Sequence, residues 1–241
     1  MSFLEQLVVE PWRQQHQSGA GGVHEEPLVF RALREDEVTT FRDGLNPPQS
    51  STEFSAAEAV GEGSTVASCF VHTTRDPEAA FYFAESGWNF EPSGHKIVAI
   101  DLGQRRTQAP AAEFVASLFG GSAWTGFNST VLDLSTDAGR MANGLHEGSR
   151  PYYFARMYSE VCVRGRIHPD EIVATLDTGE LGIGSTEVGF RDFRANLPHS
   201  TRDTLHSWAQ QAKIHASERP HLPEVELSLT EMMSRVQLDQ A

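Results

Sequence analysis

The feature that most constrains the fold is an irregular alternation of short, strand-length apolar runs with stretches of helical periodicity. The strand-like runs lie at 27–33, 67–72, 95–102, 158–163 and 171–176. The helical patterns lie near 3–16, 35–43, 76–84, 110–118, 135–145, 201–216 and 226–238. Because helices do not follow the strands regularly, the pattern predicts an α+β fold rather than a doubly wound parallel sheet.

The domain organisation follows from the same pattern. A chain of 241 residues can form one large domain with an appendage. We expect residues 1–22 to form a helix and a linker, residues 23–180 to form the main domain, and residues 181–241 to form a C-terminal helical extension packed on it. The Pro-, Ser- and Glu-rich segment 46–64 is predicted to be a surface loop.

Composition and charge exclude several classes of function. The formal net charge is −14 and lysine occurs only at 96 and 213, so a nucleic-acid partner, which would require a basic patch, is disfavoured. No apolar run reaches the roughly 18 residues of a membrane span. The first ten residues lack a basic stretch before an apolar one, which predicts a cytoplasmic protein or an effector secreted without a conventional signal peptide.

The cysteines and histidines do not form a recognisable metal motif. Cys69 and Cys162 fall in strand-like segments outside any CxxC pair, which favours buried thiols and leaves a single disulfide as the alternative. The histidines at 24, 95, 146 and 168 are isolated, and no HExxH motif accompanies them. We therefore expect no metal.

Three strand-linked motifs contain the candidate site residues. Arg31 lies inside the first apolar run, His72 precedes two threonines at the end of the second, and Glu160 lies in a run whose alternation predicts Tyr158, Glu160 and Cys162 on one face. Each motif alone has an ordinary explanation. Charged strand residues usually face solvent, and a strand-end histidine usually makes a structural hydrogen bond.

Together these segments resemble the Arg–Ser–Glu class of ADP-ribosyltransferases, the group that contains cholera-toxin-like and pierisin-like enzymes. The resemblance covers residues 27 to about 176. The matching positions are Phe30-Arg31, Phe70-Val71-His72-Thr73-Thr74, and Glu160 followed by Gly165, Ile167, Pro169 and Ile172-Val173. It implies a split β-sandwich of two small mixed or antiparallel sheets with surrounding helices.

The resemblance also implies a function. The chain is expected to be a toxin- or effector-like mono-ADP-ribosyltransferase, a glycosyltransferase that cleaves the nicotinamide–ribose bond of NAD without a metal. It would transfer ADP-ribose to a macromolecular acceptor, with protein favoured over nucleic acid. Glu160 would stabilise the positive charge that develops on the ribose, and Arg31 would position the phosphates of NAD. We expect Arg31 and Glu160 to meet across a cleft sized for a dinucleotide.

Other residues have two candidate roles each. His72 could donate to Glu160 or to the ribose. Thr73 and Thr74 could orient Glu160 or, for Thr74, cap the following helix. Phe81 and Tyr82 could line a nicotinamide pocket, with packing in the core as the alternative.

Two departures from the family pattern leave the activity open. His72 replaces the serine that helps to hold the catalytic glutamate, and Tyr158 stands where the family carries the Glu or Gln that engages the acceptor. Two alternatives therefore remain. One is an NAD glycohydrolase that uses the same site with water as acceptor, and the other is a non-catalytic NAD- or protein-binding module.

Overall fold

The computed structural model describes residues 28–48, 55–62, 68–86, 93–103, 131–181 and 188–218. The helices predicted at 3–16, 110–118 and 226–238 lie outside these ranges. Within them, no helix is both long enough and apolar enough to span a membrane.

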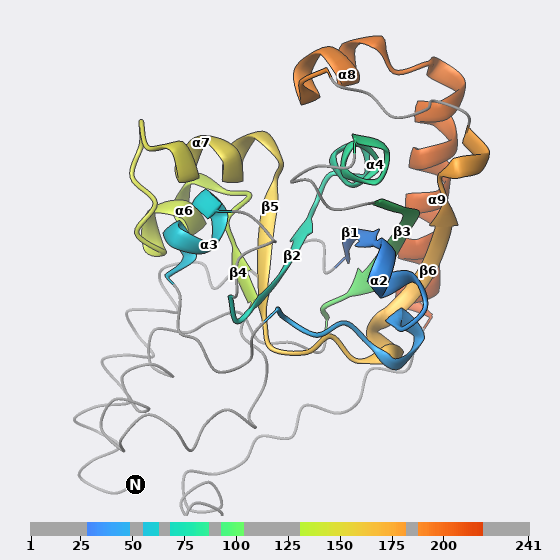
Figure 1. Ribbon diagram of the computed structural model, residues 1–241, viewed down its shortest axis with the longest axis horizontal. Helices are drawn as coiled ribbons and strands as arrows, with labels where there is room; N and C mark the ends of the chain where they lie inside the picture. Colours follow the sequence, from blue (N-terminus) through green and yellow to red (C-terminus); the bar gives the residue numbers. More distant parts are fainter. Residues whose placement is uncertain are drawn as a thin grey trace, which may run out of the picture.

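The described strands form one antiparallel sheet of six strands in the order β4-β5-β2-β1-β3-β6 (Figure 1). The strands are β1 (Leu28–Arg34), β2 (Phe70–Thr74), β3 (Ser93–Asp101), β4 (Val131–Asp133), β5 (Glu160–Arg164) and β6 (Ile172–Asp177). Together with the helices, this sheet confirms the predicted α+β class. The strands expected at the five apolar runs are all present, and the short strand β4 was not predicted.

The sheet is narrow at its centre, between β1 and β2. These two strands share a single paired position, Phe30 opposite Thr74, whereas β2 and β5 pair from Phe70 through Thr74. The next pair in this register would be Ala32 opposite His72, but there the side chain of Arg31 donates to the His72 carbonyl oxygen at 2.7 Å. The resemblance implies two separate sheets, whereas the described strands form a single one, in which Figure 1 shows β2 and β5 diverging from β1, β3 and β6.

Helices flank both halves of the sheet. The α-helices are α2 (Glu35–Val38), α3 (Ala56–Glu62), α4 (Pro77–Ser86), α6 (Asp137–Ala142), α7 (Arg150–Met157), α8 (Phe190–Asn196) and α9 (His199–Ser217), and the 3-10 helices are η2 (Phe41–Asp43), η4 (Pro169–Glu171) and η5 (Gly179–Leu181). In Figure 1, α3, α6 and α7 lie together beside β4 and β5, whereas α9 runs beside β6.

Strand alternation distributes the apolar side chains among three buried clusters. Phe30 packs with α4, α8 and α9, and its ring centroid lies 5.5 Å from that of Trp208. Phe70 packs with α3 and α7. Val29, Val71 and Val161 belong to a third cluster on the opposite sheet face. The site described below lies where these clusters meet, at the narrow joint of the sheet.

Two local predictions were wrong. The segment 46–64, predicted as a surface loop, contains α3, because Ala56, Ala59 and Val60 at i, i+3 and i+4 bury one helical face in the cluster of Phe70. The single helix predicted at 35–43 is divided into α2 and η2 by a turn at Thr39 and Thr40.

The C-terminal helices share with the rest of the fold a core and a charge network centred on one buried glutamate. Glu78 at the start of α4 is almost fully buried. Its Oε1 lies 2.9 Å from Nε of Arg202 and 3.2 Å from Nε2 of His206, and Arg194 also forms an ion pair with it. Helices α8 and α9 are therefore anchored to α4 by charge as well as by apolar packing.

Replacing Glu78 with Gln is expected to loosen this anchor. The amide cannot accept from three cationic groups, so the free energy of unfolding should fall by about 1–3 kcal/mol in urea denaturation. The exposed Glu218 at the end of α9 provides a matched control, since its change to Gln should shift stability by less than about 0.5 kcal/mol. Equal stability of both variants and the wild type would contradict the anchoring role.

Candidate functional site

The three motifs come together at the narrow joint of the sheet. Their strands β1, β2 and β5 are neighbours in the sheet order. Arg31 Nη1 lies 2.7 Å from the carbonyl oxygen of His72, and the Nδ1 atom of the same histidine lies 2.7 Å from Oε1 of Glu160. His72 therefore connects the arginine of the first motif to the carboxylate of the third.

Arg31 is held by a second partner that the sequence reasoning missed. Its Nη2 donates to both carboxylate oxygens of Glu37, at 2.8 and 3.1 Å, and the Arg31 residue is only 7% exposed. Glu37 also accepts a hydrogen bond from the backbone N–H of Arg34, three residues earlier. That i, i+3 spacing is typical of a capping box and was the available signal that Glu37 turns back towards β1.

Arg31 and Glu160 do not face each other. Phe30 pairs with Thr74, and Thr74 pairs with Glu160, so these three side chains belong to one face of the sheet. Arg31 follows Phe30 directly and therefore belongs to the other face. The expected meeting of the Arg31 guanidinium and the Glu160 carboxylate across a shared cleft is therefore wrong, and the two residues are connected through His72 instead. The reason is the register of β1 and β2, which pairs Phe30 and not Arg31 with Thr74.

His72 and Glu160 form a largely buried pair, with side chains 10% and 13% exposed. One of the two contacts expected of His72 is thus present. With the ring proton assigned to Nδ1, the imidazole donates to the carboxylate and Nε2 carries a lone pair. Among the described residues, His72 Nε2 and Arg31 Nε are buried without a hydrogen-bond partner.

The two threonines fix the backbone on either side of Glu160. The Thr73 hydroxyl donates to the carbonyl of Val161 at 2.7 Å, and the Thr74 hydroxyl donates to the carbonyl of Tyr158 at 2.5 Å. Thr74 Oγ1 also accepts from the backbone N–H of Asp76, just before α4. Thr74 therefore joins the backbone before β5 to the backbone before α4, whereas the helix itself is capped by Asp76, whose Oδ1 accepts from the backbone N–H of Glu78.

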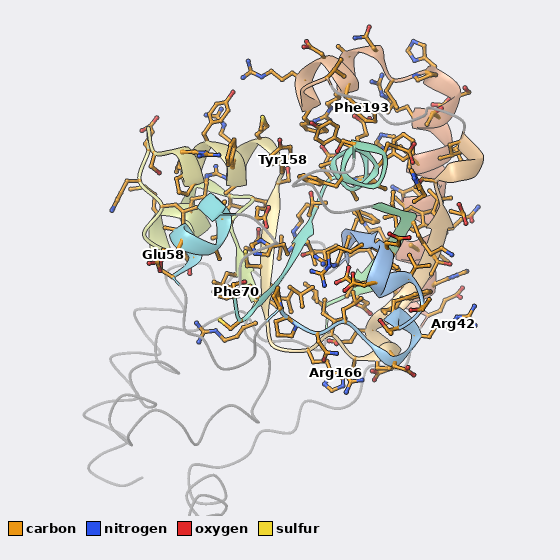
Figure 2. All side chains as sticks on the ribbon, viewed as in Figure 1. Arg42, Glu58, Phe70, Tyr158, Arg166 and Phe193 are labelled. Carbon is orange, nitrogen blue, oxygen red and sulfur yellow. The ribbon has the colours of Figure 1, made fainter. Side chains whose placement is uncertain are left out.

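Tyr158 does not lie on the strand of Glu160. It directly follows α7 as the C-cap residue, and β5 begins only at Glu160. Its ring is buried among aromatic residues of α4, α7 and α8, and Figure 2 shows it at the end of α7 on the side of α4. Burial raises the pKa of its hydroxyl well above the ordinary value. The predicted shared face of residues 158, 160 and 162 is therefore wrong at Tyr158, because that residue lies in the turn between α7 and β5.

The turn between α7 and β5 is strained at Ser159, whose φ of +49° lies in the left-handed region. Its carbonyl accepts from the backbone N–H of Arg75, which keeps the turn beside the end of β2. We expect Ser159→Gly to be at least as stable as the wild type. Ser159→Val should be less stable than Ser159→Gly by about 1–2 kcal/mol in thermal unfolding, because a branched side chain disfavours positive φ. Equal stability of the two variants would contradict the strained geometry.

Phe81 and Tyr82 lie in the protein core. Both residues are fully enclosed, and both rings pack against Phe193 of α8. Figure 2 shows Phe193 above α4. Of the two roles considered for Phe81 and Tyr82, packing in the core is the one that the structure shows. These rings would have to move to contact nicotinamide directly.

Cys162 completes a cluster that was not identified from the sequence. Its Sγ lies 3.8 Å from both His72 Nδ1 and Glu160 Oε1, and the three ligand-type atoms lie within 4.8 Å of one another. The shared face of Glu160 and Cys162 was predicted, but the pairing of His72 with Cys162 was not.

The two cysteines are not bonded to each other. Cys69 and Cys162 are both free and buried, as the sequence favoured, so the alternative of a disulfide is wrong. Burial, together with the nearby Glu160, raises the pKa of the Cys162 thiol far above the ordinary value.

A separate hollow lies at the N-terminal end of α7. It is lined by residues that include Glu147, Arg150, Tyr153 and Arg156, and it contains no member of the Arg31–His72–Glu160 network.

Comparison of the chain with protein-family models, with curated proteins and with solved structures finds no match.

Proposed function

We propose that this chain is a mono-ADP-ribosyltransferase that cleaves the nicotinamide–ribose bond of NAD and transfers ADP-ribose to a macromolecule, with protein favoured as the acceptor. One observation carries the proposal. Arg31, His72 and Glu160 come from three motifs that are far apart in sequence, yet two hydrogen bonds of 2.7 Å connect them across three neighbouring strands.

Glu160 is the proposed catalytic carboxylate. Breaking the bond between nicotinamide and ribose develops positive charge on the anomeric carbon, and nicotinamide leaves with the bonding electron pair. A fixed carboxylate beside that carbon stabilises the charge. The Nδ1–H of His72 and the two threonine hydroxyls hold Glu160 and its strand in place, so the carboxylate need not reorganise during the reaction.

His72 and Arg31 each carry a buried polar atom without a hydrogen-bond partner, His72 on the sheet face of Glu160 and Arg31 on the other face. A buried polar group without a partner costs about 1–3 kcal/mol, which a bound polar ligand can recover. His72 Nε2 and Arg31 Nε are two such atoms, and a ribose hydroxyl or a phosphate oxygen has the matching chemistry. Because Glu37 already neutralises Arg31, we assign Arg31 mainly a positioning role, through the carbonyl of His72. Binding of the NAD phosphates by Arg31 stays a prediction.

The burial of Tyr158 favours a second candidate, an NAD glycohydrolase. This residue stands where the resemblance places an acceptor-engaging side chain, but its ring is enclosed by aromatic neighbours. A site without such a side chain at its surface can admit water as the acceptor.

Incubating the purified full chain with NAD labelled in its adenylate moiety tests the proposal. Release of nicotinamide with the label on added protein acceptors is the expected result. Free ADP-ribose in an amount equal to the nicotinamide released would establish the glycohydrolase. NAD binding without nicotinamide release would establish a binding module, and neither binding nor release would overturn NAD as the ligand.

A further inference from the structure

The cluster of His72, Glu160 and Cys162 contains more ligand chemistry than the proposed NAD reaction uses. Glu160 and Cys162 are two residues apart on one face of β5, and His72 pairs directly with Cys162 from β2. One imidazole nitrogen, one carboxylate oxygen and one sulfur therefore lie within 4.8 Å of one another. The hydrogen bond between His72 and Glu160 accounts for the first two atoms but not for the position of the sulfur, which is equally distant from both.

We propose that His72, Glu160 and Cys162 form a binding site for a divalent transition-metal ion of the Zn²⁺ class. Nitrogen and sulfur donors select such ions over Mg²⁺ and Ca²⁺, which prefer oxygen ligands alone. Three protein ligands also leave a fourth tetrahedral position for water.

The spacing of the ligand atoms is close to a tetrahedral site. Zn–S bonds of about 2.3 Å and Zn–N or Zn–O bonds of about 2.0–2.2 Å, at the tetrahedral angle, place the sulfur about 3.5–3.7 Å from the other two ligand atoms. The structure has 3.8 Å for both of these separations. His72 Nδ1 and Glu160 Oε1 are 2.7 Å apart and need to separate by roughly 0.6–0.8 Å to reach the distance between two ligands of a tetrahedral site.

The charges of the cluster also match a dication. A bound carboxylate and a bound thiolate together neutralise two positive charges, and the imidazole binds as a neutral ligand. On binding, the S–H bond of Cys162 breaks, its proton leaves to solvent and the metal–sulfur bond forms. The His72 proton resides on Nε2 in that state, so that Nδ1 can coordinate. The slight exposure of His72 and Glu160 leaves the ion a route from solvent.

A bound metal would have a consequence for the NAD reaction, and this consequence alone rests on the proposed function. The carboxylate of Glu160 cannot coordinate the ion and stabilise the ribose cation at the same time. Zn²⁺ is therefore expected to inhibit nicotinamide release, and a chelator is expected to restore it.

Cobalt substitution and Zn²⁺ competition test the site directly, without NAD. The untagged full chain, stripped with a chelator, is titrated with Co²⁺. Its absorption spectrum should develop a thiolate-to-cobalt charge-transfer band that saturates at one ion per chain and that Zn²⁺, but not Mg²⁺, removes. Absence of that band in the wild-type protein would overturn the proposal.

Two cysteine variants assign the band. Cys162→Ala should lose it and bind Zn²⁺ at least ~100-fold more weakly in competition with a chromophoric chelator, because loss of a ligand exceeds the 10–100-fold effect of losing a ligand's hydrogen-bond partner. Cys69→Ala is the matched control, a buried free cysteine outside the cluster, and should keep both the band and the affinity. Loss of the band in Cys69→Ala would refute the site, and this test holds even if Cys162→Ala does not fold. A protein that binds Zn²⁺ but leaves NAD intact refutes the NAD proposal alone.

Discussion

Replacing Glu160 with Gln is expected to lower the rate of nicotinamide release by about 10²–10³-fold, the usual effect of removing one preorganised electrostatic partner of a transition state. The amide keeps the shape of the side chain but cannot stabilise a developing cation. Because the lost interaction strengthens only during bond cleavage, the decrease should appear in kcat, with little change in KM. Initial rates of nicotinamide release over a range of NAD concentrations measure both constants.

A matched control separates this effect from a general change in charge. Glu218→Gln removes the same charge from an exposed position at the end of α9 and should leave kcat and KM unchanged. Thermal unfolding of both variants shows whether the fold is retained. A folded Glu160→Gln protein with wild-type kcat would refute the catalytic role of Glu160, whatever the acceptor is.

Replacing Arg31 with Met is expected to lower the free energy of unfolding by about 3 kcal/mol, at the lower end of the range for breaking a buried ion pair. The change leaves the carboxylate of Glu37 buried without its main partner, although Arg34 still contacts it. It also removes the donor to the His72 carbonyl at the joint between β1 and β2. Chemical denaturation monitored by tryptophan fluorescence measures the loss.

Two further variants identify the source of that loss. The double change Arg31→Met with Glu37→Leu should recover most of it, because no charge then stays buried alone. Arg31→Lys should lie between Arg31→Met and the wild type, since an ammonium keeps the charge but lacks the planar fork that binds Glu37 and His72 together. Equal stability of Arg31→Met and the double variant would show that Arg31 acts mainly on His72 and not on Glu37.

These two predictions assign different roles to the ends of one network. Glu160 is the group proposed to act on the substrate, whereas Arg31 supports the strand from which His72 reaches Glu160. Arg31→Met is therefore expected to change activity through the position of His72. Arg31→Lys, which can still donate to the His72 carbonyl, should lose less activity than Arg31→Met.

The amino-acid pattern alone determined the class of the fold and most of its regular elements. The apolar run before Asp101 forms β3, the Asp76-Pro77 start of α4 forms as expected, and the helix near 201–216 is present as α9. Each of these elements is encoded by neighbouring residues, through the periodicity of its buried face and the residues at its ends. The burial of both cysteines was predictable on the same grounds.

The partners of the site residues were decided by the tertiary structure. Tyr158 lies in the turn after α7 and not in the strand, Arg31 binds Glu37 after the chain turns back, and His72 meets Cys162 through the pairing of β2 with β5. A shift of one residue in strand alignment moves a side chain to the opposite face of the sheet. That alignment depends on packing among distant segments, so local periodicity could nominate Arg31, His72 and Glu160 but could not say which of them would touch.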